Sequence, residues 1–133
     1  MTQEELQSAF EGHKAWLESS GEKGKRANFS DADLRGLDLD GVDLRGANLQ
    51  RANLEGATLR GAKLYGASFF GAILKEADLS KSDLHNASVF GADLTGANLQ
   101  GANLEGVKLA GVKISGANLE GAIGVDSSST KTR

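Results

Sequence analysis

The chain has 133 residues with 18 glycines, no proline and no cysteine, and 39% of its residues are hydrophobic, which suits a single domain. Fifteen Lys and Arg against eighteen Asp and Glu give a formal net charge of -3, too slight for direct nucleic acid binding through phosphate neutralisation. The lack of cysteine excludes disulfides, a thiolate metal cage and a cysteine nucleophile.

Targeting and membrane signals are not found in this sequence. It has no run of 18 apolar residues, and it opens with Glu4 and Glu5 where a signal peptide is basic. We therefore expect no membrane span, no export signal and a cytoplasmic protein.

The first residues predict a helix over about 3–19. Thr2 and Glu5 have the spacing of a capping box at its start. The polar segment that follows contains glycines and no apolar periodicity, so 1–26 is interpreted as a helical cap and linker. We expect Phe10 and Trp16 of the predicted helix to cover the next part of the chain. The residues on the inward stripe of this helix follow helical spacing: Leu6, Phe10, His13, Trp16 and Leu17.

The rest of the chain repeats with a period of five residues. A small or apolar residue precedes each central apolar residue by two positions, and glycine usually follows the centre by two. This period fits neither a helix nor an ordinary strand. The central positions are Phe29, Leu34, Leu39, Leu44, Leu49, Leu54, Leu59, Leu64, Phe69, Leu74, Leu79, Leu84, Val89, Leu94, Leu99, Leu104, Leu109, Ile114 and Leu119.

The period requires the chain to turn every five residues. The two apolar positions lie on one side of a short extended piece, and the next two residues form a corner, so the chain winds into coils that stack about 4.8 Å apart. Corners that end in glycine are expected to be type II turns with positive φ. At Glu76, Lys81 and Asn86 glycine is absent, and we expect another turn type there.

The repeats resemble the pentapeptide repeat proteins, whose signature Ala-Asp/Asn-Leu recurs at 47–49, 92–94 and 102–104. The resemblance covers 27–123 and implies an all-β solenoid, a right-handed quadrilateral β-helix with four repeats per coil and about five coils. The residues themselves support four per coil through the phenylalanines, four of which fall on one face in a 20-residue register: Phe29, Phe69, Phe70 and Phe90. The segment 13–17 also resembles the leader of many bacterial pentapeptide domains.

The pattern ends at Ile123, and residues 124–133, which are polar from Asp126 onward, are expected to form a flexible tail. The last coil then ends bare, so a homodimer through this coil is one option.

The sequence gives no sign of catalysis. His13 lies on the apolar stripe of the predicted helix, as expected of a packed structural histidine, and His85 lies at an outward corner without a metal-ligand partner at suitable spacing. No nucleophile stands beside a base, and the repeat explains the glycine spacings that imitate a phosphate loop. We expect no enzyme, no cofactor and no metal.

One alternative function is mimicry of DNA, since some pentapeptide proteins resemble duplex DNA and engage DNA gyrase, protecting it from toxins and quinolones. A mimic requires a continuous negative surface. One outer face of the predicted coil instead carries both signs: Asp33, Arg35, Glu55, Lys75, Glu76, Asp93 and Lys113.

The other function is a scaffold for contacts with an unknown protein partner. Phe70 and Phe90 follow central positions one coil apart, so they are expected to stack outside the wall, with Tyr65, Ile73 and His85 nearby. Clustered exposed aromatic residues typically mark an interface, which here serves a partner or a homodimer.

Overall fold

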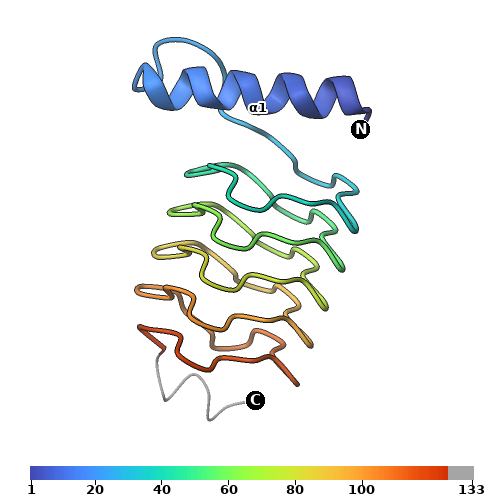
Figure 1. The fold of residues 1–133 in the computed structure, drawn as a ribbon, viewed down its shortest axis with the longest axis vertical. Helices are drawn as coiled ribbons and strands as arrows, with labels where there is room; N and C mark the ends of the chain where they lie inside the picture. The colour runs from blue at the N-terminus through green and yellow to red at the C-terminus, as the bar shows by residue number, and fades with distance from the viewer. Residues whose placement is uncertain (126–133) are drawn as a thin grey trace.

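The computed structural model describes residues 1–125 and consists of one helix and a stack of coils (Figure 1). The helix α1 spans Gln3–Glu18, and Thr2 and Glu5 form its capping box. It lies across the N-terminal end of the stack (Figure 1). Of the tail expected at 124–133, residues 126–133 lie outside the described part of the chain.

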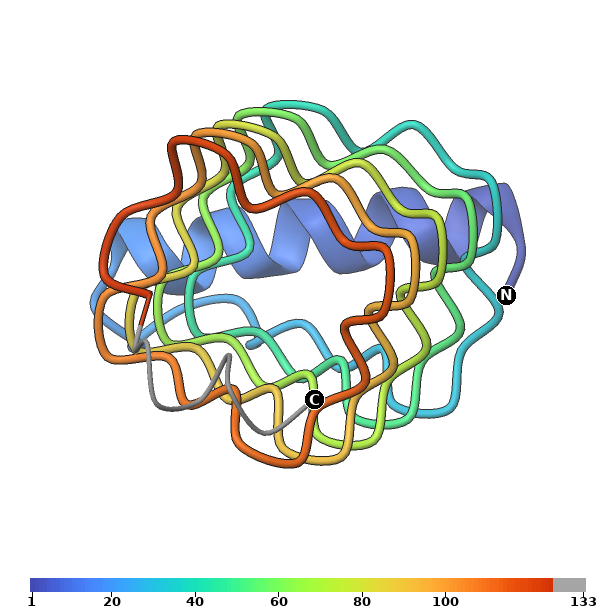
Figure 2. The same ribbon diagram turned by 90° about the horizontal axis from the view of Figure 1, so that it is seen from below.

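The coils stack with a register of 20 residues, or four five-residue repeats per turn. Every bridge between coils is parallel and joins residues 20 apart, such as Asn48 and Ser68. Each side of a coil is short, so the pairing in residues 1–125 consists of single bridges and not of longer strands. Figure 2 looks along the stack and shows the coils superimposed around a common interior.

Three backbone hydrogen bonds typically join each repeat to the one beneath it. The N–H of Leu49 donates to the carbonyl of Ser68 at 2.8 Å, and that of Arg51 donates to Phe70 at 2.8 Å. In return, the N–H of Ser68 donates to the carbonyl of Ala47 at 3.0 Å. The backbone polar groups of each short side are therefore satisfied by the neighbouring coils.

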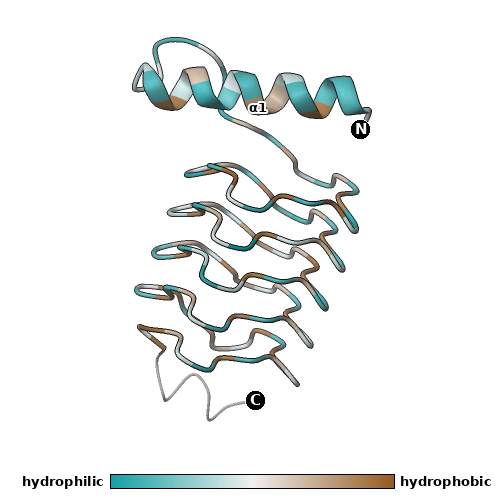
Figure 3. Ribbon diagram, in the orientation of Figure 1, coloured by the Kyte–Doolittle hydropathy of each residue, from teal (hydrophilic) through white to brown (hydrophobic). Residues whose placement is uncertain are grey.

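The interior is filled by the two apolar positions of each repeat, and hydrophobic and hydrophilic residues alternate along the coils (Figure 3). Leu49, Leu64 and Phe69 are fully buried, as are the alanines two positions ahead of them. Ser82, the one polar residue at an alanine position, is also buried, and its hydroxyl donates to the carbonyl of Leu79 at 2.7 Å. A short polar side chain is therefore tolerated in the wall.

The corners correct one expectation from the sequence. Glu76 and Lys81 have φ of +58° and Asn86 has +59°, so these residues adopt the left-handed conformation of the glycine corners, and the expected change of turn type was wrong. The cause is the stacking, because the N–H of Glu76 donates to the carbonyl of Thr95 at 2.9 Å, the bond that a glycine makes elsewhere. Left-handed backbone costs a residue with a side chain about 1–2 kcal/mol.

The inward and outward positions predict opposite responses to truncation. Leu74 is 1% exposed, whereas its neighbour Lys75 lies on the outside. We expect Leu74→Ala to lower the free energy of unfolding by about 2–5 kcal/mol and Lys75→Ala to lower it by less than about 0.5 kcal/mol. Denaturant midpoints measure both, and equal responses would contradict the inward assignment of Leu74.

The strained corners predict a reciprocal pair of effects. Lys81 and Gly61 occupy equivalent corners one coil apart, and a Cβ added to Gly61 would meet no atom within 4 Å. We expect Lys81→Gly to raise the free energy of unfolding by up to about 1 kcal/mol and Gly61→Lys to lower it by about as much. A loss of stability in both variants, measured by denaturant unfolding, would show that side-chain contacts outweigh the backbone strain.

Candidate protein interface

The helix α1 is fixed to the first coil, residues 27–46, by aromatic contacts. The rings of Phe10 and Phe29 lie 5.6 Å apart and are tilted by 52°. The ring of Trp16 lies over Gly46, where an added Cβ would approach it to 3.6 Å. The two side chains expected at this contact thus both lie on the first coil.

His13 joins the helix to the coil through both ring nitrogens and is fully buried. The N–H of Ala27 donates to Nδ1 at 2.9 Å, so the ring proton lies on Nε2, which donates to the carbonyl of Arg45 at 2.9 Å. Its ring also stacks on Trp16 at 5.4 Å. Burial lowers the pKa of His13, against the opposing effects of the Arg45 carbonyl and of Asp43.

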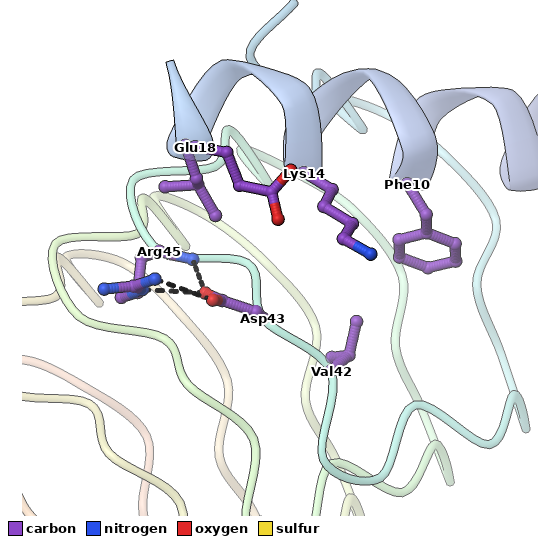
Figure 4. Close-up of a pocket in the computed structure, with 7 residues that line it drawn as sticks. Phe10, Lys14, Glu18, Val42, Asp43 and Arg45 are labelled. Carbon is purple, nitrogen blue, oxygen red and sulfur yellow. Dashed lines mark hydrogen bonds and ion pairs between the residues drawn. The ribbon is translucent and has the colours of Figure 1, made fainter. Parts of the chain in front are cut away.

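A crevice of about 380 Å³ lies between α1 and the first coil (Figure 4). Lys14 and Glu18 extend from the helix, and Asp43 and Arg45 form a bidentate ion pair on the coil, with both contacts at 2.8 Å. The formal charges of these two positive and two negative side chains sum to zero. Phe10 of the helix also lines the crevice. The crevice therefore belongs to the contact between the helix and the coil, and it offers no net charge to an ionic ligand.

The two hydrogen bonds of His13 predict that helix docking depends on pH. A proton on Nδ1 removes the acceptor for the N–H of Ala27. Because the pKa of His13 is lower in the folded state, its contribution is complete above its ordinary value of 6.5 and is lost as pH falls below that value. We expect the fluorescence of Trp16 to report undocking of α1 as the pH falls from 7.5 to 5.

His13→Gln should remove this pH response, and His85→Gln should retain it. A response in the His13→Gln variant equal to that of the wild type would exclude the histidine as its source.

Arginine and aspartate pair repeatedly on the outside of the first coils. Arg51 binds Asp31 across the 20-residue register at 2.9 Å, and Arg60 binds Asp40 in the same way at 2.8 Å. Within single repeats Arg35 binds Asp33 at 2.8 Å and Arg45 binds Asp43 at 2.8 Å. The guanidinium of Arg35 lowers the pKa of Asp33 to about 2. Exposed pairs of this kind add little stability, but they interrupt any continuous negative surface.

Phe70 and Phe90 stack outside the wall. Their ring centroids are 5.5 Å apart and their planes differ by 16°, with exposed fractions of 43% and 66%. They occupy the same corner of successive coils because they are 20 residues apart, and the stacking follows from the register. The rings therefore present one continuous apolar surface to solvent.

Tyr65 and His85 form a second column at the preceding corner. Their ring centroids lie 4.0 Å apart, and Tyr65 is 42% exposed. Nδ1 of His85 lies 2.8 Å from the carboxylate of Asp83, which orients the imidazole. This column precedes the phenylalanine column by five residues, so the two columns border the same side of the coil.

Ser68 and Ser88 lie between the two columns, and sequence reasoning missed them. They bridge each other on that side and alternate with the buried positions on either side of them. We call this surface the aromatic face, with two aromatic columns and small side chains between them: Tyr65, Ser68, Phe70, His85, Ser88 and Phe90. The five-residue offset between Tyr65 and Phe70 is the signal that identifies it.

Ile73 does not join the aromatic columns. It lies on the next side of the coil, is half-buried and bridges Asn53 and Asp93. The structure thus brings together Tyr65 with His85 and Phe70 with Phe90, and it places Ile73 on the adjoining side of the coil.

Residues 1–125 contain neither a metal-binding cluster of side chains nor a helix suited to a membrane. Within 1–125 no three His, Cys, Asp or Glu side chains are grouped so that they could hold a metal ion. Over the same range, no helix is both long and apolar enough to cross a membrane, α1 included.

A scan against protein-family models matches pentapeptide repeats in eight copies, over residues 27–66, 62–89 and 90–123. A search of curated protein sequences finds no match.

Solved structures with the same fold include a pentapeptide repeat protein from the thylakoid lumen of Arabidopsis thaliana, with 37% identity and a TM-score of 0.57 over 71% of this chain and 63% of that one. A pentapeptide repeat protein from the cyanobacterium Cyanothece 51142 has 29% identity and a TM-score of 0.58, covering 72% and 84% of the two chains. This chain thus spans less than two thirds of the Arabidopsis protein.

A third structure is that of QnrB1, a plasmid-mediated fluoroquinolone resistance protein, in a trypsin-treated form. It has 21% identity and a TM-score of 0.52, and the match covers 81% of this chain and 61% of that one. At this identity the match supports the fold alone. Together, the family match and these structures confirm the pentapeptide repeat β-helix, right-handed and quadrilateral.

Proposed function

The chain belongs to the pentapeptide repeat family, and we propose that it is a non-enzymatic scaffold that binds a protein partner through the aromatic face. In this proposal the scaffold is a rod of about five coils with α1 as the cap of its N-terminal end. The aromatic face carries the proposal because it gathers three of the five large apolar side chains that stand most exposed in residues 1–125: Tyr65, Phe70 and Phe90.

An apolar surface of this kind favours association because burying it removes apolar area from water. Each square ångström buried contributes about 25 cal/mol. Tyr65 and His85 add polar atoms at one border, and the serines between the columns leave room for a partner's side chains. Aromatic residues are enriched at the centres of protein interfaces.

The alternative, a DNA mimic that binds gyrase, receives less support. Four aspartates on the first coils are paired with arginines at 2.8–2.9 Å, so the negative charge there is neutralised locally: Asp31, Asp33, Asp40 and Asp43. The similarity to QnrB1 lies in the fold. A surface whose charges alternate in sign does not imitate the continuous negative charge of a DNA duplex, and it is better suited to contacts with a protein partner.

We expect the double variant Phe70→Ser with Phe90→Ser to lose association with its partner, or with a second copy, by at least about tenfold. Its free energy of unfolding should change by less than about 1 kcal/mol, since both rings lie outside the core. Sedimentation velocity measures self-association. Quantitative mass spectrometry of proteins cross-linked to the tagged chain in its source cells measures partner binding.

A matched control substitutes Lys75→Ser and Thr95→Ser, which occupy the next corner of the same two coils. This control should associate like the wild type. Undiminished association of the phenylalanine variant would overturn the interface, and a large loss of its stability would show that the rings belong to the core.

A further inference from the structure

The backbone ladder is interrupted at one place. Repeats 20 residues apart are joined by three hydrogen bonds, as between 67–71 and 87–91, where Phe69 donates to Ser88, Gly71 to Phe90, and Ser88 to Ala67. Between 87–91 and 107–111 all three equivalent bonds are absent, and so is the bridge from Ser88. Within residues 1–125 no other step lacks all three.

Six backbone groups are left without a backbone partner at this interruption. The upper edge offers the carbonyl of Ala87 and the N–H groups of Val89 and Gly91, and the lower edge offers both groups of Lys108 and the carbonyl of Ala110. An unpaired backbone group is costly unless water or a ligand satisfies it. The interruption is therefore a place where a ligand with matching groups gains hydrogen bonds.

A cavity of about 490 Å³ lies at the same place. The residues of both edges line it, and Phe90 extends the aromatic face directly to its rim. The lining is Asn86, Ala87, Ser88, Val89, Phe90, Gly106, Lys108 and Ala110. The interruption and the aromatic face are thus one continuous surface.

The sequence departs from the repeat at the interrupted step. Val107 stands at an inward position that is alanine in every coil above it, as at Ala87, and the larger side chain is fully within the wall. Val112 makes the same exchange in the next repeat, where the bond from Lys113 to Ala92, at 3.3 Å, is the longest between coils. The step at Val112 keeps all three bonds, so of these two exchanges only Val107 lies in the interrupted step.

We propose that this interruption receives an extended segment of the partner, whose backbone pairs with the edge at 87–91. The proposal rests on the proposed function and specifies how the partner is recognised. The unpaired backbone groups include both donors and acceptors, in the order found along a parallel strand. An extended polypeptide can pair with both kinds of group, whereas an anion or a metal ion can pair with only one. A single residue in the register of Lys108 would donate to Ala87 and accept from Val89.

The side chains around the edge select the sequence of that segment. The Phe90 ring favours an apolar residue beside it, and the exposed Lys108 ammonium, which makes no ion pair in residues 1–125, favours an acidic one. The backbone supplies the pairing and these two side chains supply the preference.

The first test is amide hydrogen exchange in the free protein. The N–H groups of Val89 and Gly91 should exchange at least about tenfold faster than those of Phe69 and Gly71, their equivalents one coil above. Equal protection of the two pairs would overturn the interruption and with it the strand proposal.

The second test adds a peptide probe, Asn-Ala-Ser-Val-Phe-Gly-Ala, blocked at both ends and identical to residues 86–92. Bound in register, it should slow the exchange of Val89 and Gly91 by at least about tenfold at saturation. The same peptide N-methylated at its serine keeps every side chain but loses the donor to Ala87, and it should give no protection. Equal protection by both peptides, or none by either, would overturn backbone pairing.

The third test closes the interruption. Val107→Ala restores the alanine of the other coils, and we expect it to protect the N–H groups of Val89 and Gly91 in the free protein and to abolish protection by the peptide. Phe70 and Phe90 stay in place in this variant. If capture of the partner is unchanged in Val107→Ala but lost in the Phe70→Ser and Phe90→Ser variant, the strand proposal fails and the scaffold function stands.

Discussion

The parallel backbone pairing with a 20-residue register is the constraint from which the rest of the molecule follows. Because residue i lies above residue i+20 on every side, each outward position becomes a column of like positions. The stacked rings of Phe70 and Phe90 and the ion pair of Asp31 with Arg51 are both consequences of this register. The spacing along the sequence therefore determines which side chains are neighbours on the outer surface.

The same pairing overrides local preference at the corners. A left-handed backbone is unfavourable at Glu76, but in this conformation its N–H donates to the carbonyl of Thr95 in the coil below. The strain of about 1–2 kcal/mol is offset by a hydrogen bond of comparable size and by continuity of the ladder on both sides. Glycine is the easiest residue at the corner, and the ladder is what imposes its conformation.

Much of this architecture could be read from the sequence because the signal is repeated many times. The inward positions, the capping box at Thr2 and Glu5 and the stacking of Phe70 on Phe90 all follow from spacing. The left-handed corner at Lys81 could not be read from the sequence. Backbone propensity is a local property, whereas the constraint on this corner comes from hydrogen bonding to the neighbouring coil. The hydrogen bonds of the two His13 ring nitrogens could not be read from the sequence either, because their partners Ala27 and Arg45 are distant along the chain.

A regular repeat makes every coil alike, so specificity has to come from departures from the repeat. The aromatic residues at Phe70 and Phe90 change the surface of two successive coils, and Val107 changes the interior of the last one. The first departure supplies apolar area, and the second lies at the step where backbone groups beside that area lack a backbone partner. Each has a cost when solvent alone covers it, exposed apolar area in one case and unpaired polar groups in the other. Because a single extended segment removes both costs together, their adjacency favours one partner over two separate ligands.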